Sequence, residues 1–191
     1  MFHKITSFVG FLFKSRNKHS VHSPFVFNLI TKCFHKKCTI ADLNTFLNYK
    51  KELSLNTSIL EVTDFGAGSR IFSSNKRKVS KIAKHVGISN KRARLLINII
   101  QYFKPGSILE IGTSLGLSTA ALASSNKNSK ITTLEGCKET SSIAKNMFEK
   151  YHFNNVKLLT GSFDTTLPKI FKNTIYDFIY FDGNHTRKAT L

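Results

Sequence analysis

Apolar residues recur at steps of three and four through the first part of the chain. In residues 2–13 they form one stripe, and Lys4 and Lys14 lie off it. This spacing predicts an amphipathic helix. Its stripe can pack on the body of the protein or lie on a membrane surface, and the sequence favours packing.

A second helix is predicted to begin at Pro24. The Ser23 hydroxyl can accept a hydrogen bond from a free amide there, and proline at the first helical position loses no hydrogen bond. Helical patterns continue as far as residue 54. We therefore expect residues 1–58 to form an N-terminal helical extension.

From Ile59 onwards, short apolar runs alternate with helical patterns. Predicted strands span residues 107–111, 130–134, 156–160 and 176–182, and predicted helices span residues 92–103, 117–123 and 139–151. Strands that alternate with helices are joined by right-handed crossovers into a parallel sheet with helices on both faces. Residues 59–191 are therefore predicted to form an α/β domain.

The composition is that of a globular protein. Of the 191 residues, 41% are hydrophobic and 21% are charged, which excludes collagen-like and disordered chains. No apolar run approaches the ~20 residues that cross a bilayer, and no small-residue cleavage site follows residues 8–13, so we expect neither a membrane span nor a signal peptide. Three cysteines, none in C-x-x-C spacing, indicate a reduced, cytoplasmic protein.

The charge is strongly basic and unevenly distributed. The formal net charge is +18, and residues 1–95 carry 18 Lys and Arg against 4 Asp and Glu. Such a half can attract phosphate backbones or anionic lipids. Because the charge is dispersed rather than packed into short basic blocks, the sequence favours a general compositional bias over a nucleic-acid patch.

The ends of the predicted strands carry the candidate chemistry, because open parallel sheets bind ligands there. After the first strand comes Glu110-Ile111-Gly112-Thr113-Ser114-Leu115-Gly116. The glycines allow a tight turn, and the following helix presents free amides to a negative group. After the second strand comes Glu135, which can accept hydrogen bonds from ribose hydroxyls.

These residues resemble a known family. Residues 108–119 are similar to the first motif of class I S-adenosylmethionine-dependent methyltransferases, and above all to small O-methyltransferases of the catechol and caffeoyl-CoA type. Residues 133–135 resemble their ribose-binding acid motif, residues 160–163 their adenine-side loop and residues 178–182 their fourth-strand motif. The order and spacing hold from about residue 90 to 188. The resemblance implies the Rossmann-like fold of this class and S-adenosylmethionine as cofactor.

The resemblance also implies roles for individual residues. The implied cofactor-binding set is Glu110, Gly112, Thr113, Ser114, Gly116, Ser118, Glu135, Gly161 and Ser162. Within it, the glycine turn would wrap the methionine part, Ser118 would lie near its carboxylate, and Glu135 would hold the ribose. Asp182 lies where metal-dependent relatives place a cation ligand, and His185 lies where the catechol type has a catalytic lysine. The alternatives are that Asp182 caps a turn and that His185 is a surface histidine.

A second glycine motif, at residues 59–70, also looks like a strand followed by a cofactor loop. No Asp or Glu occurs between Asp64 and Glu110, so the ribose-binding acid expected ~20 residues further on is missing. We interpret residues 64–70 as an ordered turn near the substrate entrance, with Arg70 facing an anion, or as a packing turn.

The family's sheet has seven strands, whereas this chain ends at Leu191, soon after the fourth. We therefore expect an incomplete sheet and an N-terminal portion of a longer protein. The fourth strand would be an apolar edge and an aggregation hazard, to be covered by a missing C-terminal segment or by a second copy in a homo-oligomer. Asp182 alone cannot make a dedicated divalent-metal site, so the metal is left unassigned.

The predicted function is S-adenosylmethionine-dependent methyl transfer to the oxygen of a small molecule, in a chain that is partial or inactive alone. One alternative is an RNA-modifying methyltransferase that uses the basic first half. It ranks lower because no RNA-binding module of the RRM type is present. A non-catalytic interaction module that retains the fold is the other alternative.

Overall fold

The computed structural model describes residues 2–14, 22–36, 38–63, 74–172 and 174–183. The chain divides into two compact units, Met1–Lys37 and Cys38–Leu191. The sequence instead predicted a boundary between residues 58 and 59. The structure places the division earlier because helix α3 (Ile40–Leu55) packs against helices of the second unit.

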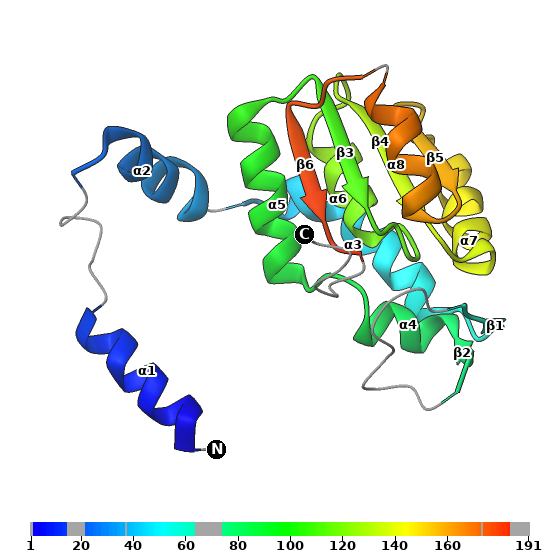
Figure 1. Ribbon diagram of the computed structural model, residues 1–191, viewed down its shortest axis with the longest axis horizontal. Coiled ribbons are helices and arrows are strands. Elements are labelled where there is room, and N and C mark those ends of the chain that lie inside the picture. The colour runs from blue at the N-terminus through cyan, green and yellow to red at the C-terminus, as the bar shows by residue number, and fades with distance from the viewer. Residues whose placement is uncertain (1, 15–21, 37, 64–73, 173, 184–191) are drawn as a thin grey trace. The chain divides into compact units, whose positions relative to one another are not determined.

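The first unit is helical, as predicted. It contains α1 (Phe2–Lys14) and α2 (Pro24–Asn28), which continues into a π-helical turn, η2 (Leu29–Phe34) (Figure 1). The Ser23 hydroxyl accepts a hydrogen bond from the Val26 N–H, and Pro24 is the first helical residue. The predicted start of this helix is therefore confirmed.

The second unit contains all the strands that the structure describes. Its elements after α3 are β1 (Ile59–Glu61), β2 (Lys76–Lys78), α4 (Val79–His85), α5 (Asn90–Phe103), β3 (Ser107–Ile111), α6 (Leu117–Ser125), β4 (Lys130–Glu135), α7 (Lys138–Lys150), β5 (Val156–Thr160), α8 (Phe163–Phe171) and β6 (Phe178–Phe181). The four predicted strands are β3, β4, β5 and β6. Strands β1 and β2 pair as a short antiparallel ribbon, which the sequence did not predict.

The central sheet is parallel, with the strand order β5-β4-β3-β6. The chain steps from β3 to β4 to β5 in one direction and then returns to place β6 on the other side of β3 (Figure 1). This order confirms the predicted α/β, Rossmann-like fold. Within the described residues β6 is one edge of the sheet, as the sequence predicted for the fourth strand.

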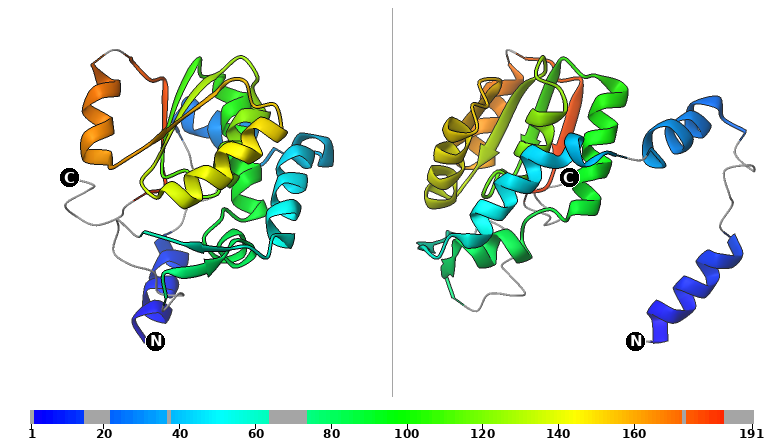
Figure 2. Two further views of the ribbon diagram at one scale, coloured as in Figure 1. Left: turned by 90° about the vertical axis from the view of Figure 1, so that its right-hand side faces the viewer. Right: turned by 180° about the vertical axis from the view of Figure 1, so that it is seen from behind.

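Helices cover both faces of the sheet. Alternate residues of a strand point to opposite faces, so Ile108 joins a large core with side chains of α3, α5, α6 and α7, whereas Leu109 joins a smaller core. Phe163 and Leu167 of α8 pack against the smaller core. Figure 2 (left) shows α8 on one side of the sheet and α5, α6 and α7 on the other.

Helix α3 is fixed to the sheet domain by a buried tyrosine. Tyr49 is fully buried among the rings of Phe148, Tyr151 and Phe153. Its hydroxyl donates a 2.8 Å hydrogen bond to the carbonyl of Leu115. This bond ties α3 to the turn between β3 and α6, 66 residues further along the chain.

We expect Tyr49→Phe to lower the free energy of unfolding by about 1–2 kcal/mol, because the buried Leu115 carbonyl loses its donor. Urea unfolding followed by circular dichroism measures this loss. The control is Tyr102→Phe, which removes a hydroxyl from an exposed ring of α5 and should change stability by less than about 0.5 kcal/mol. Equal stability of the two variants would contradict the role of Tyr49.

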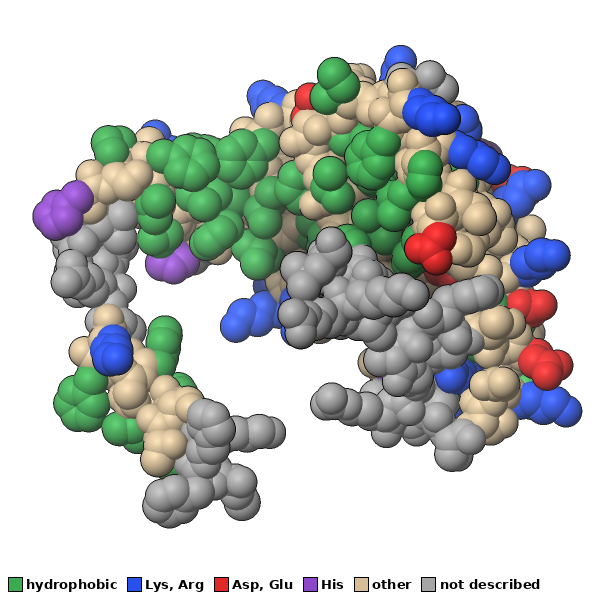
Figure 3. Space-filling model, in the orientation of Figure 1, with side chains coloured by type: hydrophobic (Ala, Val, Ile, Leu, Met, Phe, Trp, Pro, Cys, Tyr) green, Lys and Arg blue, Asp and Glu red, His purple; other side chains and the backbone are tan. Residues whose placement is uncertain are grey.

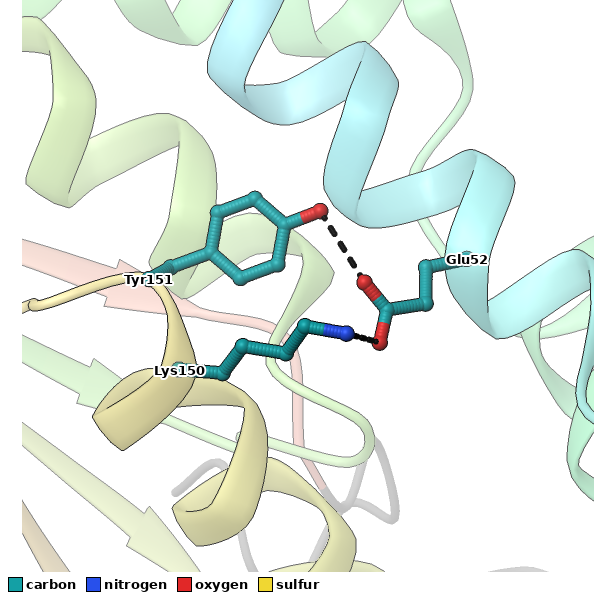
Figure 4. Close-up of polar contacts among 3 residues, drawn as sticks. All are labelled: Glu52, Lys150 and Tyr151. Atoms are coloured by element: carbon teal, nitrogen blue, oxygen red, sulfur yellow. Dashed lines mark hydrogen bonds and ion pairs between the residues drawn. The ribbon is translucent and has the colours of Figure 1, made fainter.

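A polar contact also joins α3 to the end of α7 (Figure 4). The Lys150 ammonium forms an ion pair with Glu52, and the Tyr151 hydroxyl donates a 3.3 Å hydrogen bond to the same carboxylate. Both charged side chains are exposed, and exposed pairs contribute only about 0–1 kcal/mol. The attachment of α3 therefore depends mainly on Tyr49 and its apolar neighbours.

Candidate functional site

The turn after β3 has an unusual backbone. Gly112, Ser114 and Gly116 all have positive φ angles, at 103°, 50° and 79°. The N–H groups of Gly112 and Thr113 both donate to the Leu134 carbonyl at 3.0 Å, and the Gly116 N–H donates to the Thr113 carbonyl at 2.8 Å. The turn is thus held against the end of β4 and leads into the first turn of α6.

Gly112 allows the end of β6 to approach this turn. A Cβ atom at position 112 would lie 2.7 Å from the Asp182 carbonyl oxygen and 2.7 Å from the Gly183 Cα. The Asp182 N–H donates to the Ile111 carbonyl at 2.9 Å. Glycine is therefore required at position 112 because a side chain there would clash with the end of β6.

A pocket of about 280 Å³ lies beyond the carboxyl ends of β3 and β6, and we call it the switch-point pocket. It is lined by Gly112–Leu115, Leu117, Ser118, Asp182 and Gly183, and on the α4 side by Ile82, Ala83 and Val86–Ile88. The strand order reverses between β3 and β6. Open parallel sheets generally bind ligands at such a point.

The α4 wall of this pocket was not predicted from the sequence. Val79, Ile82, Ala83 and Val86 follow the i, i+3, i+4, i+7 spacing of an amphipathic helix, and three of them are buried. That spacing was the available signal. It indicates a buried helix face but not a ligand, because all four side chains are apolar.

Glu135 meets the glycine turn at the end of β4. Its Oε2 accepts a 2.6 Å hydrogen bond from the Ser114 N–H, and its Oε1 accepts a 2.9 Å hydrogen bond from the Cys137 N–H. Burial raises the pKa of this carboxyl group, while the two N–H donors oppose the rise. Each carboxylate oxygen keeps a second acceptor position for a ligand, although Glu135 does not itself line the switch-point pocket.

Glu110 is fully buried beneath the turn rather than open to the pocket. Its Oε2 accepts hydrogen bonds from the hydroxyls of Thr119 and Thr133. The Thr133 hydroxyl is also hydrogen-bonded to that of Thr113, so a chain of buried polar groups connects Glu110 to the glycine turn. Glu110 Oε1 has no hydrogen-bond partner among the described residues.

Burial raises the pKa of Glu110 to about 7, although the hydrogen bonds from Thr119 and Thr133 oppose the rise. The unfolded chain releases this proton near pH 4.5, whereas the folded chain retains it up to about pH 7. Between those values the folded state binds more protons, so stability falls as the pH rises. Below both values the group contributes no pH dependence.

We therefore expect wild-type stability to fall by about 2 kcal/mol more than that of Glu110→Gln between about pH 5 and 8. The glutamine side chain retains an oxygen acceptor and does not ionise. Urea unfolding of both proteins at a series of pH values measures the difference. Parallel stability profiles for the two proteins would contradict the raised pKa.

The other candidate residues are distributed around the same edge of the sheet. Ser118 and Asp182 line the switch-point pocket. Gly161 follows β5, where its N–H donates to the Glu135 carbonyl at 2.8 Å, and Ser162 is the N-cap of α8. Neither lines the pocket. His185 and the interpreted turn at residues 64–70, with Arg70, lie outside the described residues.

Two further features are absent from the residues that the structure describes. The described residues contain no group of three or more His, Cys, Asp or Glu side chains placed to hold a metal ion. Within the same part of the chain, no helix combines the length and apolar character needed to cross a membrane.

The parallel sheet, its strand order and the glycine turn after β3 are those of a Rossmann-like α/β fold. Residues 109–191 match the sequence family described as "Methyltransferase domain". This match begins within β3 and includes the glycine turn, Glu135, Gly161, Ser162 and Asp182. It confirms the resemblance inferred from the sequence motifs.

Solved methyltransferase structures share this fold. The S-adenosylhomocysteine-bound methyltransferase PaMTH1 of Podospora anserina has a TM-score of 0.55 and 19% identity, over 89% of this chain and 61% of that one. The Bacillus cereus O-methyltransferase in complex with S-adenosylhomocysteine has a TM-score of 0.50 and 22% identity, over 83% of this chain and 60% of that one. TomG of Streptomyces achromogenes, an O-methyltransferase of tomaymycin synthesis in complex with S-adenosylmethionine, has a TM-score of 0.51 and 17% identity, over 89% of this chain and 64% of that one.

At these identities the likeness shows the fold. The chain spans between 60% and 64% of the length of these three proteins. No curated protein matches the chain significantly.

Proposed function

We propose that this protein is an S-adenosylmethionine-dependent methyltransferase that methylates an oxygen atom of a small molecule. The observation that carries the proposal is the position of the switch-point pocket. It lies where the strand order reverses, between the glycine turn after β3 and Asp182 after β6. The match of residues 109–191 to a methyltransferase domain supports the same assignment.

The residues present fit this cofactor. A pocket of about 280 Å³ is at the small end of ligand sites, so we assign it the methionine part. The Ser118 hydroxyl and the free amides at the start of α6 suit the carboxylate. The carboxyl ends of β4 and β5 are left for the nucleoside, with Glu135 accepting from ribose hydroxyls and Gly161 and Ser162 beside the adenine.

The bound cofactor would supply a methyl group that is already electrophilic, on a sulfonium centre. The chain must then align the acceptor oxygen with that carbon and remove the acceptor proton. Asp182 is the described carboxylate on the pocket wall and is our candidate base. His185 stays a second candidate. The apolar wall formed by α4 would exclude water from the reacting atoms.

Calorimetric titration with S-adenosylhomocysteine tests the proposal on the full chain. We expect saturable binding with one site per chain. Absence of binding by a chain that circular dichroism shows to be folded would overturn the assignment. Transfer of a labelled methyl group from S-adenosylmethionine to catechol then tests the reaction itself. Binding without transfer to catechol or related hydroxyl compounds would favour the non-catalytic alternative.

A further inference from the structure

Helix α1 exposes large apolar side chains over most of its length. At about 100° per residue, one arc of the helix contains Ile5, Phe8, Val9, Leu12 and Phe13. The exposed fraction is 58% for Ile5, 59% for Phe8 and 87% for Phe13, and Figure 3 shows hydrophobic side chains at the surface of this helix. Lys14 lies on the opposite side of the helix. A helix of this kind leaves its apolar arc in water unless another surface covers it.

The charge of the chain favours an anionic partner for the first unit. The first unit, residues 1–37, contains seven Lys and Arg and no Asp or Glu. The second unit contains 22 Lys and Arg against 11 Asp and Glu, a formal charge of +11. Both the second unit and a second copy, at +18, would repel the first unit. Charge complementarity instead favours an anionic partner.

The apolar arc of α1 distinguishes between two kinds of anionic partner, a nucleic acid and a lipid bilayer. A nucleic acid would neutralise the basic charge, but it offers no apolar interior for the side chains of Ile5 and Val9. A bilayer with anionic head groups offers both. The other side of α1 carries Lys14 and the exposed ring of Phe11, so most of the basic charge comes from the rest of the first unit. An apolar arc beside basic residues is the pattern of helices that lie in the plane of a membrane interface.

The length of α1 decides how it would meet a bilayer. Its 13 residues span about 20 Å at about 1.5 Å per residue, which is shorter than the ~30 Å hydrocarbon core. The helix is too short to cross that core and long enough to bury its whole apolar arc at the surface.

We propose that α1 docks this protein on anionic lipid surfaces, with the arc around Phe8 and Phe13 among the acyl chains and Lys14 among the head groups. The proposal is independent of methyl transfer, because no residue of the switch-point pocket takes part. The interpretation of α1 as a helix packed on the protein body, favoured from the sequence, is the competing one.

Vesicle co-sedimentation of the full chain tests the proposal. We expect binding to phosphatidylcholine vesicles that contain phosphatidylserine, weaker binding to phosphatidylcholine alone, and a loss of binding as salt screens the charge. The double variant Phe8→Ser/Phe13→Ser should partition at least roughly tenfold more weakly, since the affinity of such helices scales with buried apolar area. Thermal melting should match that of the wild type, because both side chains are exposed.

A matched control removes two exposed apolar side chains outside α1. Ile59 is 62% exposed and Ile175 is 90% exposed, and the variant Ile59→Ser/Ile175→Ser should bind vesicles as the wild type does. The proposal is overturned if the wild type does not bind anionic vesicles, if it binds neutral ones equally well, or if the control loses binding to the same extent. It is also overturned if Phe8→Ser/Phe13→Ser instead dissociates a dimer in sedimentation velocity or abolishes binding of labelled RNA while vesicle binding is unchanged.

Discussion

Alanine in place of Glu135 should weaken S-adenosylhomocysteine binding at least about 100-fold, as measured by calorimetric titration. The variant would lose the two charge-assisted hydrogen bonds that we assign to the Glu135 carboxylate and the ribose hydroxyls, each contributing about 1.5–3 kcal/mol. The N–H groups of Ser114 and Cys137 would also lose their acceptor, which loosens the glycine turn. Glu135→Gln keeps one oxygen acceptor and should lose about tenfold.

The matched control for this prediction is Glu149→Ala. Glu149 is an exposed acid of α7, so its removal changes the net charge by the same amount without touching the strand ends. Its affinity should equal that of the wild type. An unchanged affinity in Glu135→Ala, or an equal loss in Glu149→Ala, would contradict the role of Glu135 in binding.

Gly112→Ala should lower the free energy of unfolding by about 3–5 kcal/mol. The new Cβ would lie 2.7 Å from both the Asp182 carbonyl oxygen and the Gly183 Cα, a distance at which the backbone must move. The φ angle of 103° is also strained for any residue with a Cβ. We expect the end of β6 to separate from β3, with loss of the pocket wall formed by Asp182. Urea unfolding measures the stability.

Gly10→Ala is the control for this second prediction. A Cβ at position 10 would meet no atom within 4 Å, and alanine favours a helix over glycine. The stability should stay within about 0.5 kcal/mol of the wild type or rise. Equal unfolding midpoints for Gly112→Ala and the wild type would show that β6 does not approach the turn as described.

The strands of the main sheet were predictable because their signal is local. Ser107–Ile111 and Val156–Thr160 are apolar runs bounded by turn residues, and both are strands with the predicted bounds. The helix from Asn90 to Phe103 was also indicated by its sequence, because its apolar residues repeat at helical spacing. The spacing of apolar residues shows which side chains will be buried, and this spacing indicates a helix or a strand without knowledge of any long-range contact.

Elements that depend on partners elsewhere in the chain were not predictable. Strand β2 reads Lys-Arg-Lys and is a strand because it pairs with Ile59–Glu61. The assignment of α3 to the second compact unit was not predictable for the same reason, since it depends on tertiary contacts such as the packing of α3 on other helices and the hydrogen bond from Tyr49 to Leu115. Helix α8 has only nine residues and contains Pro168. Its apolar residues Phe163, Leu167 and Ile170 share one face and pack on the smaller core, a helical spacing that the sequence interpretation did not use.

The candidate site was predictable in part. The motifs indicated that Glu135 and the glycine turn share one edge of the sheet, and the hydrogen bond from Ser114 to Glu135 shows that they do. The motif could not tell that Glu110 points into the core, where Thr119 and Thr133 bind it. The α4 wall was missed because it precedes the first motif by about 25 residues and carries no polar signature.

The strand order has a consequence for folding of the protein during its translation on the ribosome. Strands β3, β4 and β5 follow one another along the chain, so they can associate as each emerges. Strand β6 pairs with β3 across 70 residues of intervening chain, as at Ile108 and Phe178. The glycine turn therefore lacks its facing wall until β6, the last described strand, has been translated. A nascent chain cannot hold a ligand between the ends of β3 and β6 before then.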